Sequence, residues 1–254
     1  MYHCIYYHGR GQEFECSGVG FRDFYAGTRG RAGRLLLLKS EFFGDRLVQN
    51  FEVLEGGEDT QRLLGEYGDE ALRFGDLHLL DYAEADGAER LSEEEIKELL
   101  YASHTWRIPP QTVLDRLGSR FVRYSHDDDW YCKLHLREPS DFFDMLACSV
   151  KTEARRRCEE KRGALRRGLR AGAWLTQEAD AGMDAQVKQE LYRLGAQGVF
   201  IDIEAAHPER DVLECLMYVI GVFSDMDEMF LRKPEAAAKP AAVLRFDGRT
   251  WSLR

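Results

Sequence analysis

The sequence lacks several features that would place it in a particular class of protein. No apolar run approaches the roughly 18 consecutive residues that a helix needs to cross a bilayer. The first residues, Met1–His8, have neither the basic start nor the long apolar core of a secretory signal peptide. These absences predict a cytoplasmic protein that does not associate with membranes.

The cysteines form no C-x-x-C pair and no spacing typical of a zinc site. There are six, at Cys4, Cys16, Cys132, Cys148, Cys158 and Cys215. Most fall on predicted apolar faces, where a thiol acts as a small hydrophobic side chain. We therefore expect reduced structural cysteines, no bound metal and no cofactor.

Recognisable catalytic motifs are also missing. Seven histidines and six cysteines allow many pairs by chance, but none lies in a nucleophile context such as Gly-x-Ser-x-Gly. The sequence also shows no internal repeat. It assigns no catalytic residue and favours a protein that is not an enzyme.

The patterns that are present predict an α+β fold. Residues 1–54 alternate apolar and polar positions, including the stretch Gln12–Phe24, and are punctuated by glycines. This pattern is typical of short antiparallel strands joined by tight turns. We expect a β-rich, acidic-ended domain over residues 1–88 and a mixed α/β domain over 89–254, with a single domain as the alternative.

The second part contains several signals for individual elements. Ser92 and Glu95 form a capping box, which predicts a helix start. Phe121–Leu136 has the pattern of a hairpin, and a long helix is expected to follow from Ser140. Further expected elements are helices over 111–117, 184–194 and 208–222, a strand over 199–203 and a hairpin over 242–253.

The hairpin contains an apparent Cys132/His135 pair that strand geometry separates. Side chains in a strand alternate between its two faces. Cys132 is therefore expected in the core and His135 on the outer face beside Lys133. Without a bulge the two cannot meet at a metal or as a nucleophile and its base.

The hairpin turn carries three adjacent carboxylates, Asp127, Asp128 and Asp129. Such oxygens suit calcium or magnesium, but the EF-hand spacing is absent and consecutive aspartates rarely converge. A solvated turn is the favoured interpretation, and metal binding is the alternative.

Asp202 and Glu204 lie at the end of the apolar Val199–Ile203 stretch. Asp-x-Glu after such a strand resembles the first metal-binding motif of DEDD-type exonucleases. That resemblance implies carboxylates holding metal ions for phosphodiester cleavage, with Asp202 and Glu204 as catalytic residues. It covers a short stretch only, and the rest of the chain does not follow that family.

The segment Gly27–Gly33 is glycine-rich and basic, with Arg29, Arg31 and Arg34 in or beside it. Backbone amides of such a loop can hold a phosphate. The Walker A ending is missing, however, and Leu35–Leu38 has the pattern of a strand rather than a helix. A surface loop is the simpler interpretation.

Charge is distributed unevenly in a chain whose net charge is −10. Residues 52–98 hold sixteen acidic and four basic groups, a balance of −12. Residues 151–170, in the expected long helix, hold nine basic and three acidic groups, a balance of +6. The candidate partner-binding residues are Arg155, Arg156, Lys161, Arg162, Arg166, Arg167 and Arg170.

Three destinations fit this basic helix face: solvent or the acidic segment, an acidic protein, or nucleic acid. Arginine outnumbers lysine seven to two there, which suits bidentate contacts with carboxylates or phosphates. The acidic balance of the whole chain disfavours nucleic acid, because phosphate affinity depends on positive charge. We expect a cytoplasmic binding protein, regulatory or immunity-like, whose partner is a protein. The alternatives are a nucleic-acid-binding module and a metal-dependent nuclease.

Overall fold

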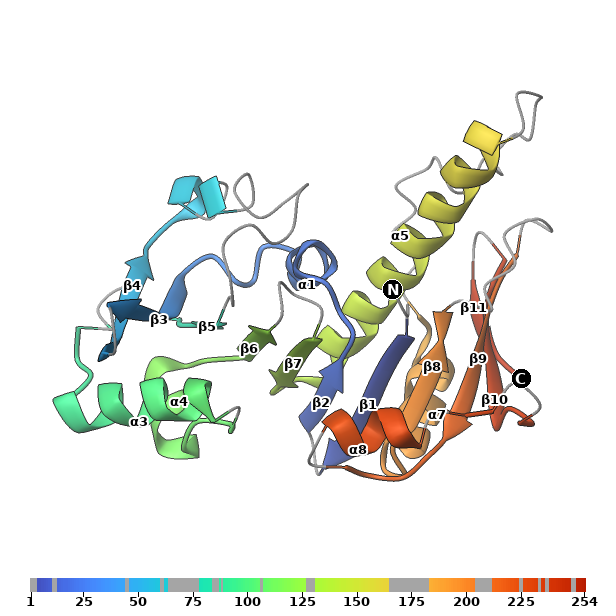
Figure 1. The fold of residues 1–254 in the computed structure, drawn as a ribbon. Helices are drawn as coiled ribbons and strands as arrows, with labels where there is room; N and C mark the ends of the chain where they lie inside the picture. Colours follow the sequence, from blue (N-terminus) through green and yellow to red (C-terminus); the bar gives the residue numbers. More distant parts are fainter. Residues whose placement is uncertain are drawn as a thin grey trace. The chain divides into compact units, whose positions relative to one another are not determined.

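The computed structural model divides the chain into two compact units, one of them discontinuous in sequence. The first unit contains residues 1–19 and 139–254, and the second contains residues 20–138. The structure describes residues 4–10, 13–43, 46–59, 62–63, 78–83, 87, 89–105, 107–126, 131–164, 183–203, 212–223, 226–232, 234–235, 238–247 and 250–254. Helices and antiparallel strands occur together, so the architecture is α+β (Figure 1).

The sheet of the first unit has the strand order β11-β10-β9-β8-β1-β2. The strands are β1 (Cys4–Arg10), β2 (Glu13–Ser17), β8 (Val199–Asp202), β9 (Leu213–Val219), β10 (Ala242–Phe246) and β11 (Trp251–Leu253). All five neighbouring pairs in this order are antiparallel. The hairpin expected over 242–253 is therefore confirmed as β10 and β11.

Among its described residues, the first unit has the helices α5 (Pro139–Ala164), α7 (Ala185–Gly195) and α8 (Met226–Leu231). Both α5 and α7 pack against strands of the sheet and against each other. An aromatic cluster lies between them and the strands, with Phe14 stacked on Phe142 and Tyr7 beside both. The Asp184 side chain accepts a hydrogen bond from Val187 N–H and so begins α7 at the expected place.

The sheet of the second unit has the order β7-β6-β5-β3-β4. Its strands are β3 (Leu35–Phe43), β4 (Arg46–Leu54), β5 (His78–Asp81), β6 (Phe121–His126) and β7 (Tyr131–Leu136), and its helices are α1 (Phe21–Thr28), α3 (Glu93–His104) and α4 (Gln111–Leu117). One apolar cluster joins residues of α3 and α4, such as Leu99 and Leu114, to Leu36, Leu80 and Val122 of the strands. The predicted Ser92/Glu95 capping box is present, and α4 ends at Gly118 with a φ of 62°.

Two predicted elements have the wrong secondary structure. Residues 213–219 form strand β9, whereas a helix was expected over 208–222; their burial alternates with a two-residue period along most of the strand. A short apolar run does not distinguish a helix from a strand until its neighbours are known. Within the stretch Gln12–Phe24, the residues from Phe21 onward begin helix α1, because Phe21 and Phe24 are buried at helical spacing.

The expected boundary between residues 88 and 89 lies inside the second unit. Strand β5, before that point, pairs with β6, after it. Within the described part of the chain, no helix is both long and apolar enough to cross a bilayer.

Candidate functional site

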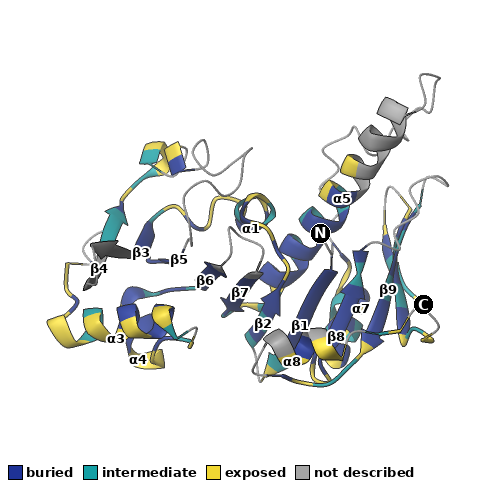
Figure 2. Ribbon diagram, viewed as in Figure 1, coloured by how far each residue is buried: buried dark blue, intermediate teal, exposed yellow. Residues whose placement is uncertain are grey.

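Helix α5 is anchored through its first half. Phe142, Leu146 and Val150 recur at intervals of four residues and are fully buried. Figure 2 colours most of the first half of α5 as buried. An apolar stripe with this spacing stays on one side of a helix for several turns. The first half of α5 is therefore a core element that fixes the direction of the residues after it.

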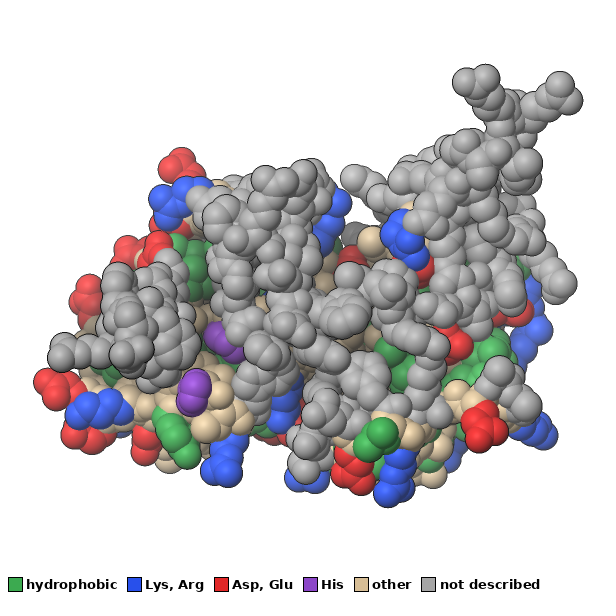
Figure 3. All heavy atoms as spheres, in the orientation of Figure 1, with side chains coloured by type: hydrophobic (Ala, Val, Ile, Leu, Met, Phe, Trp, Pro, Cys, Tyr) green, Lys and Arg blue, Asp and Glu red, His purple; other side chains and the backbone are tan. Residues whose placement is uncertain are grey.

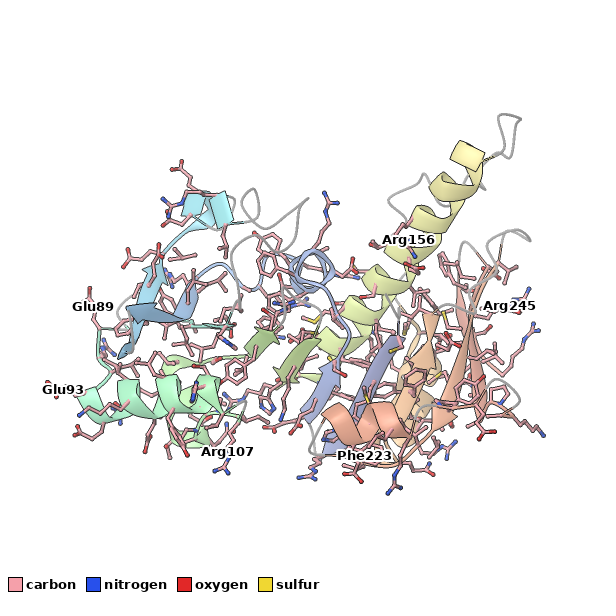
Figure 4. All side chains as sticks on the ribbon, viewed as in Figure 1. Glu89, Glu93, Arg107, Arg156, Phe223 and Arg245 are labelled. Carbon is pink, nitrogen blue, oxygen red and sulfur yellow. The ribbon has the colours of Figure 1, made fainter. Side chains whose placement is uncertain are left out.

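The first strongly charged turn of α5 is partly neutralised within the helix. Glu153 is only 5% exposed, and its carboxylate accepts hydrogen bonds from Arg156 Nε at 2.9 Å and Nη2 at 2.7 Å. This two-pronged contact is the strong form of an arginine–carboxylate pair. Arg156, labelled in Figure 4, therefore contributes less to any external positive surface than its sequence position implies.

One turn earlier, Lys151 also interacts within the unit. Its ammonium lies 5.2 Å from the ring centroid of Phe246 on β10, a cation–π distance. Of the predicted partner-binding residues, the structure describes the side chain of Arg156 alone. Arg155, Lys161 and Arg162 stand on the helical backbone, which continues to Ala164, and their side chains are outside the description. Arg166, Arg167 and Arg170 lie outside the described residues.

The predicted acidic segment, residues 52–98, belongs to the second unit, whereas α5 belongs to the first. Acidic side chains gather at the N-terminal end of α3 in Figure 3, where Figure 4 labels Glu89 and Glu93. Part of this charge is matched locally: Arg116 Nη1 contacts Glu95 Oε1 at 2.9 Å, and Arg62 lies 3.5 Å from Asp59. Both cations belong to the same unit as the acidic segment.

Asp202 ends strand β8 and lies in register with Cys4 on β1 and Leu216 on β9. Burial, and to a lesser extent the charge of Asp202, raises the pKa of Tyr218. Glu204, its proposed catalytic partner, lies outside the described residues. Among the residues that are described, no three His, Cys, Asp or Glu side chains are grouped so that they could hold a metal ion.

The predicted hairpin is present, with β6 and β7 paired from Phe121↔Leu136 to His126↔Tyr131. Its acidic turn, Asp127 to Asp129, lies outside the described residues, so the weak metal-site hypothesis remains a prediction. Cys132 is buried, as expected.

The expected solvent exposure of His135 is wrong, because this side chain is only 6% exposed. Its register partner, Val122, belongs to the apolar cluster that includes Leu99 of α3 and Leu114 of α4. This face of the sheet is therefore covered by helices, which the alternation within one strand could not reveal.

The Gly27–Gly33 segment contains a helix C-terminus, since α1 ends at Thr28 and Arg29 adopts a left-handed conformation. A helix C-terminus carries negative partial charge, which opposes an anion. Two of the arginines also bond to backbone carbonyls: Arg31 to Gly27 at 3.0 Å and Arg34 to Ala83 at 2.6 Å. The geometry does not support phosphate binding here.

Sequence reasoning missed two buried charged residues of the second unit. Arg123 is fully buried, with its guanidinium 5.5 Å from the Phe21 ring centroid and 5.9 Å from that of Phe24. Asp81 accepts three hydrogen bonds at one oxygen, from Ser119 Oγ at 3.0 Å and from Arg120 N–H and Phe121 N–H at 2.7 Å each. The sequence signal that could have identified them is a charged residue in an apolar strand: Arg123 lies within β6, and Asp81 ends β5.

Comparison with known proteins returns no match among family models, curated proteins or solved structures. Arguments about function therefore depend on the residues and their geometry.

Proposed function

We propose that this chain is a binding protein that engages an acidic protein partner through the second half of α5. The observation that carries the proposal is the continuation of α5 to Ala164, beyond the buried Glu153. In Figure 1 these turns extend past the ends of β1 and β8 of the same unit. A helix that is packed into the core at one end can hold the basic residues at its other end in a fixed position for a partner to bind.

The charge of this half supports an acidic target. Residues 154–164 contain five basic and two acidic groups, a balance of +3, and Arg166, Arg167 and Arg170 follow. Most of these basic groups are arginines, which form bidentate contacts with the carboxylates of another protein. Opposite charge across an interface speeds association and selects the partner.

Two observations favour a protein over nucleic acid. The chain has a net charge of −10, which repels a polyanion at long range, and Glu159 and Glu160 interrupt the basic run. A carboxylate-bearing protein surface can accommodate such interruptions with its own basic groups. A phosphate backbone has no basic group to place opposite these glutamates, because every repeat carries negative charge.

A cytoplasmic location is part of the proposal. Cys4, Cys16, Cys132 and Cys215 are buried thiols rather than halves of disulfides, and Cys148 is a half-buried thiol. Thiols that stay reduced are typical of the cytosol.

Affinity capture from a lysate of the source cells, compared across three forms of the protein, tests this function. The first is the wild type. The second carries Arg155→Glu, Arg157→Glu and Arg162→Glu. The matched control carries the same charge change at Arg107, Arg193 and Arg232, which are exposed elsewhere on the chain. We expect an acidic protein to bind the wild type and the control, and to lose at least tenfold in affinity for the α5 variant.

The other functions predict different results. Retardation of DNA or RNA at low salt, abolished by the α5 substitutions, would assign the face to nucleic acid. A manganese-induced thermal shift that is lost in Asp202→Ala would indicate the metal-dependent nuclease instead. Equal capture by the wild type and the α5 variant contradicts the proposed function.

A further inference from the structure

Strand β4 is the terminal strand in the order given for the second unit. It pairs with β3 through nine consecutive register positions, from Arg46↔Phe43 to Leu54↔Leu35. Within the described part of the chain, no strand lies on its other side. Its sequence contains no proline and no lysine, the residues that most often protect a strand edge. A long edge of this kind is a template for another strand.

The hydrogen-bond pattern identifies which residues of β4 face outward. Tyr82 N–H donates to Arg34 C=O at 3.3 Å, so the backbone of Arg34 faces β5. Successive residues of an antiparallel strand face opposite neighbours. Odd-numbered residues of β3 therefore face β4, where the register pairs them with even-numbered residues. The N–H and C=O groups of residues 47, 49, 51 and 53 are left at the outer edge.

We propose that β4 pairs with β4 of a second copy of this chain, antiparallel and centred on Gln49. In this register Gln49 lies opposite its own counterpart, position 47 lies opposite Phe51, and position 46 lies opposite Glu52. In this register, residues whose backbone N–H and C=O groups face the outer edge of one copy lie opposite such residues of the other copy, as antiparallel pairing requires. Three residue pairs exchange two bonds each, giving about six backbone hydrogen bonds.

Charge complementarity selects this register. It places Arg46 of each copy opposite Glu52 of the other, twice across the symmetric pair. Centring the pair on Asn50 instead would set Glu52 against Val48 and remove both opposite-charge pairs. The Glu52 side chain is 40% exposed and contacts Arg62 at 3.8 Å.

The apolar positions agree with the same register. Phe51 and Val53 are half-buried and pack against the apolar cluster beneath α3 and α4. The pairing places position 47, a leucine in the sequence, opposite Phe51 in the register. Apolar cross-strand pairs of this type stabilise a sheet.

Sedimentation velocity over a range of concentrations tests the proposal on the full chain. We expect a reversible wild-type dimer whose dissociation constant rises about tenfold in Arg46→Glu or in Glu52→Arg, because each creates two like-charge pairs. The double variant exchanges the charges and is expected to restore the wild-type dissociation constant. A wild type that stays monomeric, or a double variant no better than the singles, overturns the proposal.

Two further substitutions test the edge and the register. Gln49→Pro removes an outward N–H that β3 does not use, so it is expected to abolish the dimer while circular dichroism stays unchanged. Gln49→Cys places two thiols on residues about 5.5 Å apart at Cα, within reach of a disulfide, whereas Asn50→Cys does not. Oxidation is therefore expected to cross-link the first variant and not the second. A dimer that persists in Gln49→Pro contradicts pairing through β4.

Discussion

At the scale of single residues, substitution is most restricted where a polar group is buried or where two backbone segments lie in close contact. Asp81 is 4% exposed, and its three donors all reach Oδ1, which fixes the start of β6 to the end of β5. Burial raises the pKa of Asp81 from 3.8 to about 6, outweighing the hydrogen bonds, which lower it. A proton on Oδ2 displaces none of the three donors.

The raised pKa of Asp81 makes stability depend on pH in a defined direction. Between 3.8 and about 6 the folded chain binds more protons than the unfolded chain, so the contribution of this group is complete below 3.8 and is lost as pH rises through about 6. Asp81→Asn keeps an acceptor without the charge. We expect it to match or exceed wild-type stability at pH 7, with the difference shrinking towards pH 4. Urea unfolding at both pH values measures this.

Asp81→Ala is the informative contrast, because it removes the acceptor from three donors. We expect a loss of about 3 kcal/mol in the free energy of unfolding at pH 7, from buried donors left without a partner. If the alanine variant were as stable as the asparagine variant, Asp81 would not be holding the two strands together.

A second residue-scale prediction concerns Gly198, which has a φ of +73°. A Cβ there would lie 1.9 Å from the backbone oxygen of Gly221, which cannot move like a side chain. Gly198→Ala is therefore expected to cost about 3 kcal/mol or more, measured as a shift in the urea midpoint. Gly57→Ala is the control, since nothing lies within 4 Å of its added Cβ, and it should leave the midpoint nearly unchanged.

At the scale of elements, the start of α3 is the clearest case of local sequence setting local structure. Ser92 Oγ accepts from Glu95 N–H at 3.3 Å, and Ser92 N–H donates to Glu95 Oε2 at 2.8 Å. Both bonds satisfy amides that a helix start leaves without intrahelical partners.

Ser92→Ala removes one of these bonds and is expected to destabilise the second unit by about 1 kcal/mol, seen as a lower Tm. Ser92→Asp keeps a capping oxygen and should stay close to the wild type. A similar loss of stability in both variants would mean that any substitution at position 92 is destabilising, and that the capping hydrogen bond is not the cause.

Helix α5 shows the limit of element-scale prediction. Its apolar stripe and its N-terminal start near Ser140 were predictable from spacing alone, and the structure has the helix from Pro139 to Ala164. The pairing of Arg156 with a buried Glu153 was not, because Glu153 takes its burial from the strands and helices packed around it. The basic face as a partner site remains a proposal for the lysate experiment.

At the scale of the whole molecule, the chain leaves the first unit after Val19 and returns at Pro139. The second unit is continuous, with its own strands and its own apolar cluster. The first unit needs both ends of the chain, since β1 lies between β2 and β8 in its sheet.

This arrangement predicts different behaviour for two fragments. Residues 20–138 expressed alone are expected to fold and to unfold cooperatively, because the consecutive strands β7-β6-β5-β3-β4 and the apolar cluster beside them all come from this fragment. Residues 139–254 alone lack β1 and β2 and leave Phe142 without the Phe14 and Tyr7 rings, so we expect no cooperative transition. Circular dichroism with thermal unfolding checks both fragments, and a folded C-terminal fragment would contradict the division.

The sequence by itself determined the elements whose signals are local. The Ser92 capping box, the Gly118 helix end, the 121–136 hairpin and the 242–253 hairpin depend on residues within a few positions of one another. Tertiary structure decided the rest. Whether residues 213–219 form a strand depends on β8 and β10 on either side. Whether His135 is buried depends on α3 and α4, which pack on the face of the sheet that carries its register partner Val122. Those neighbouring elements are distant in the sequence, so a short-range pattern does not determine which of them will pack against a given residue.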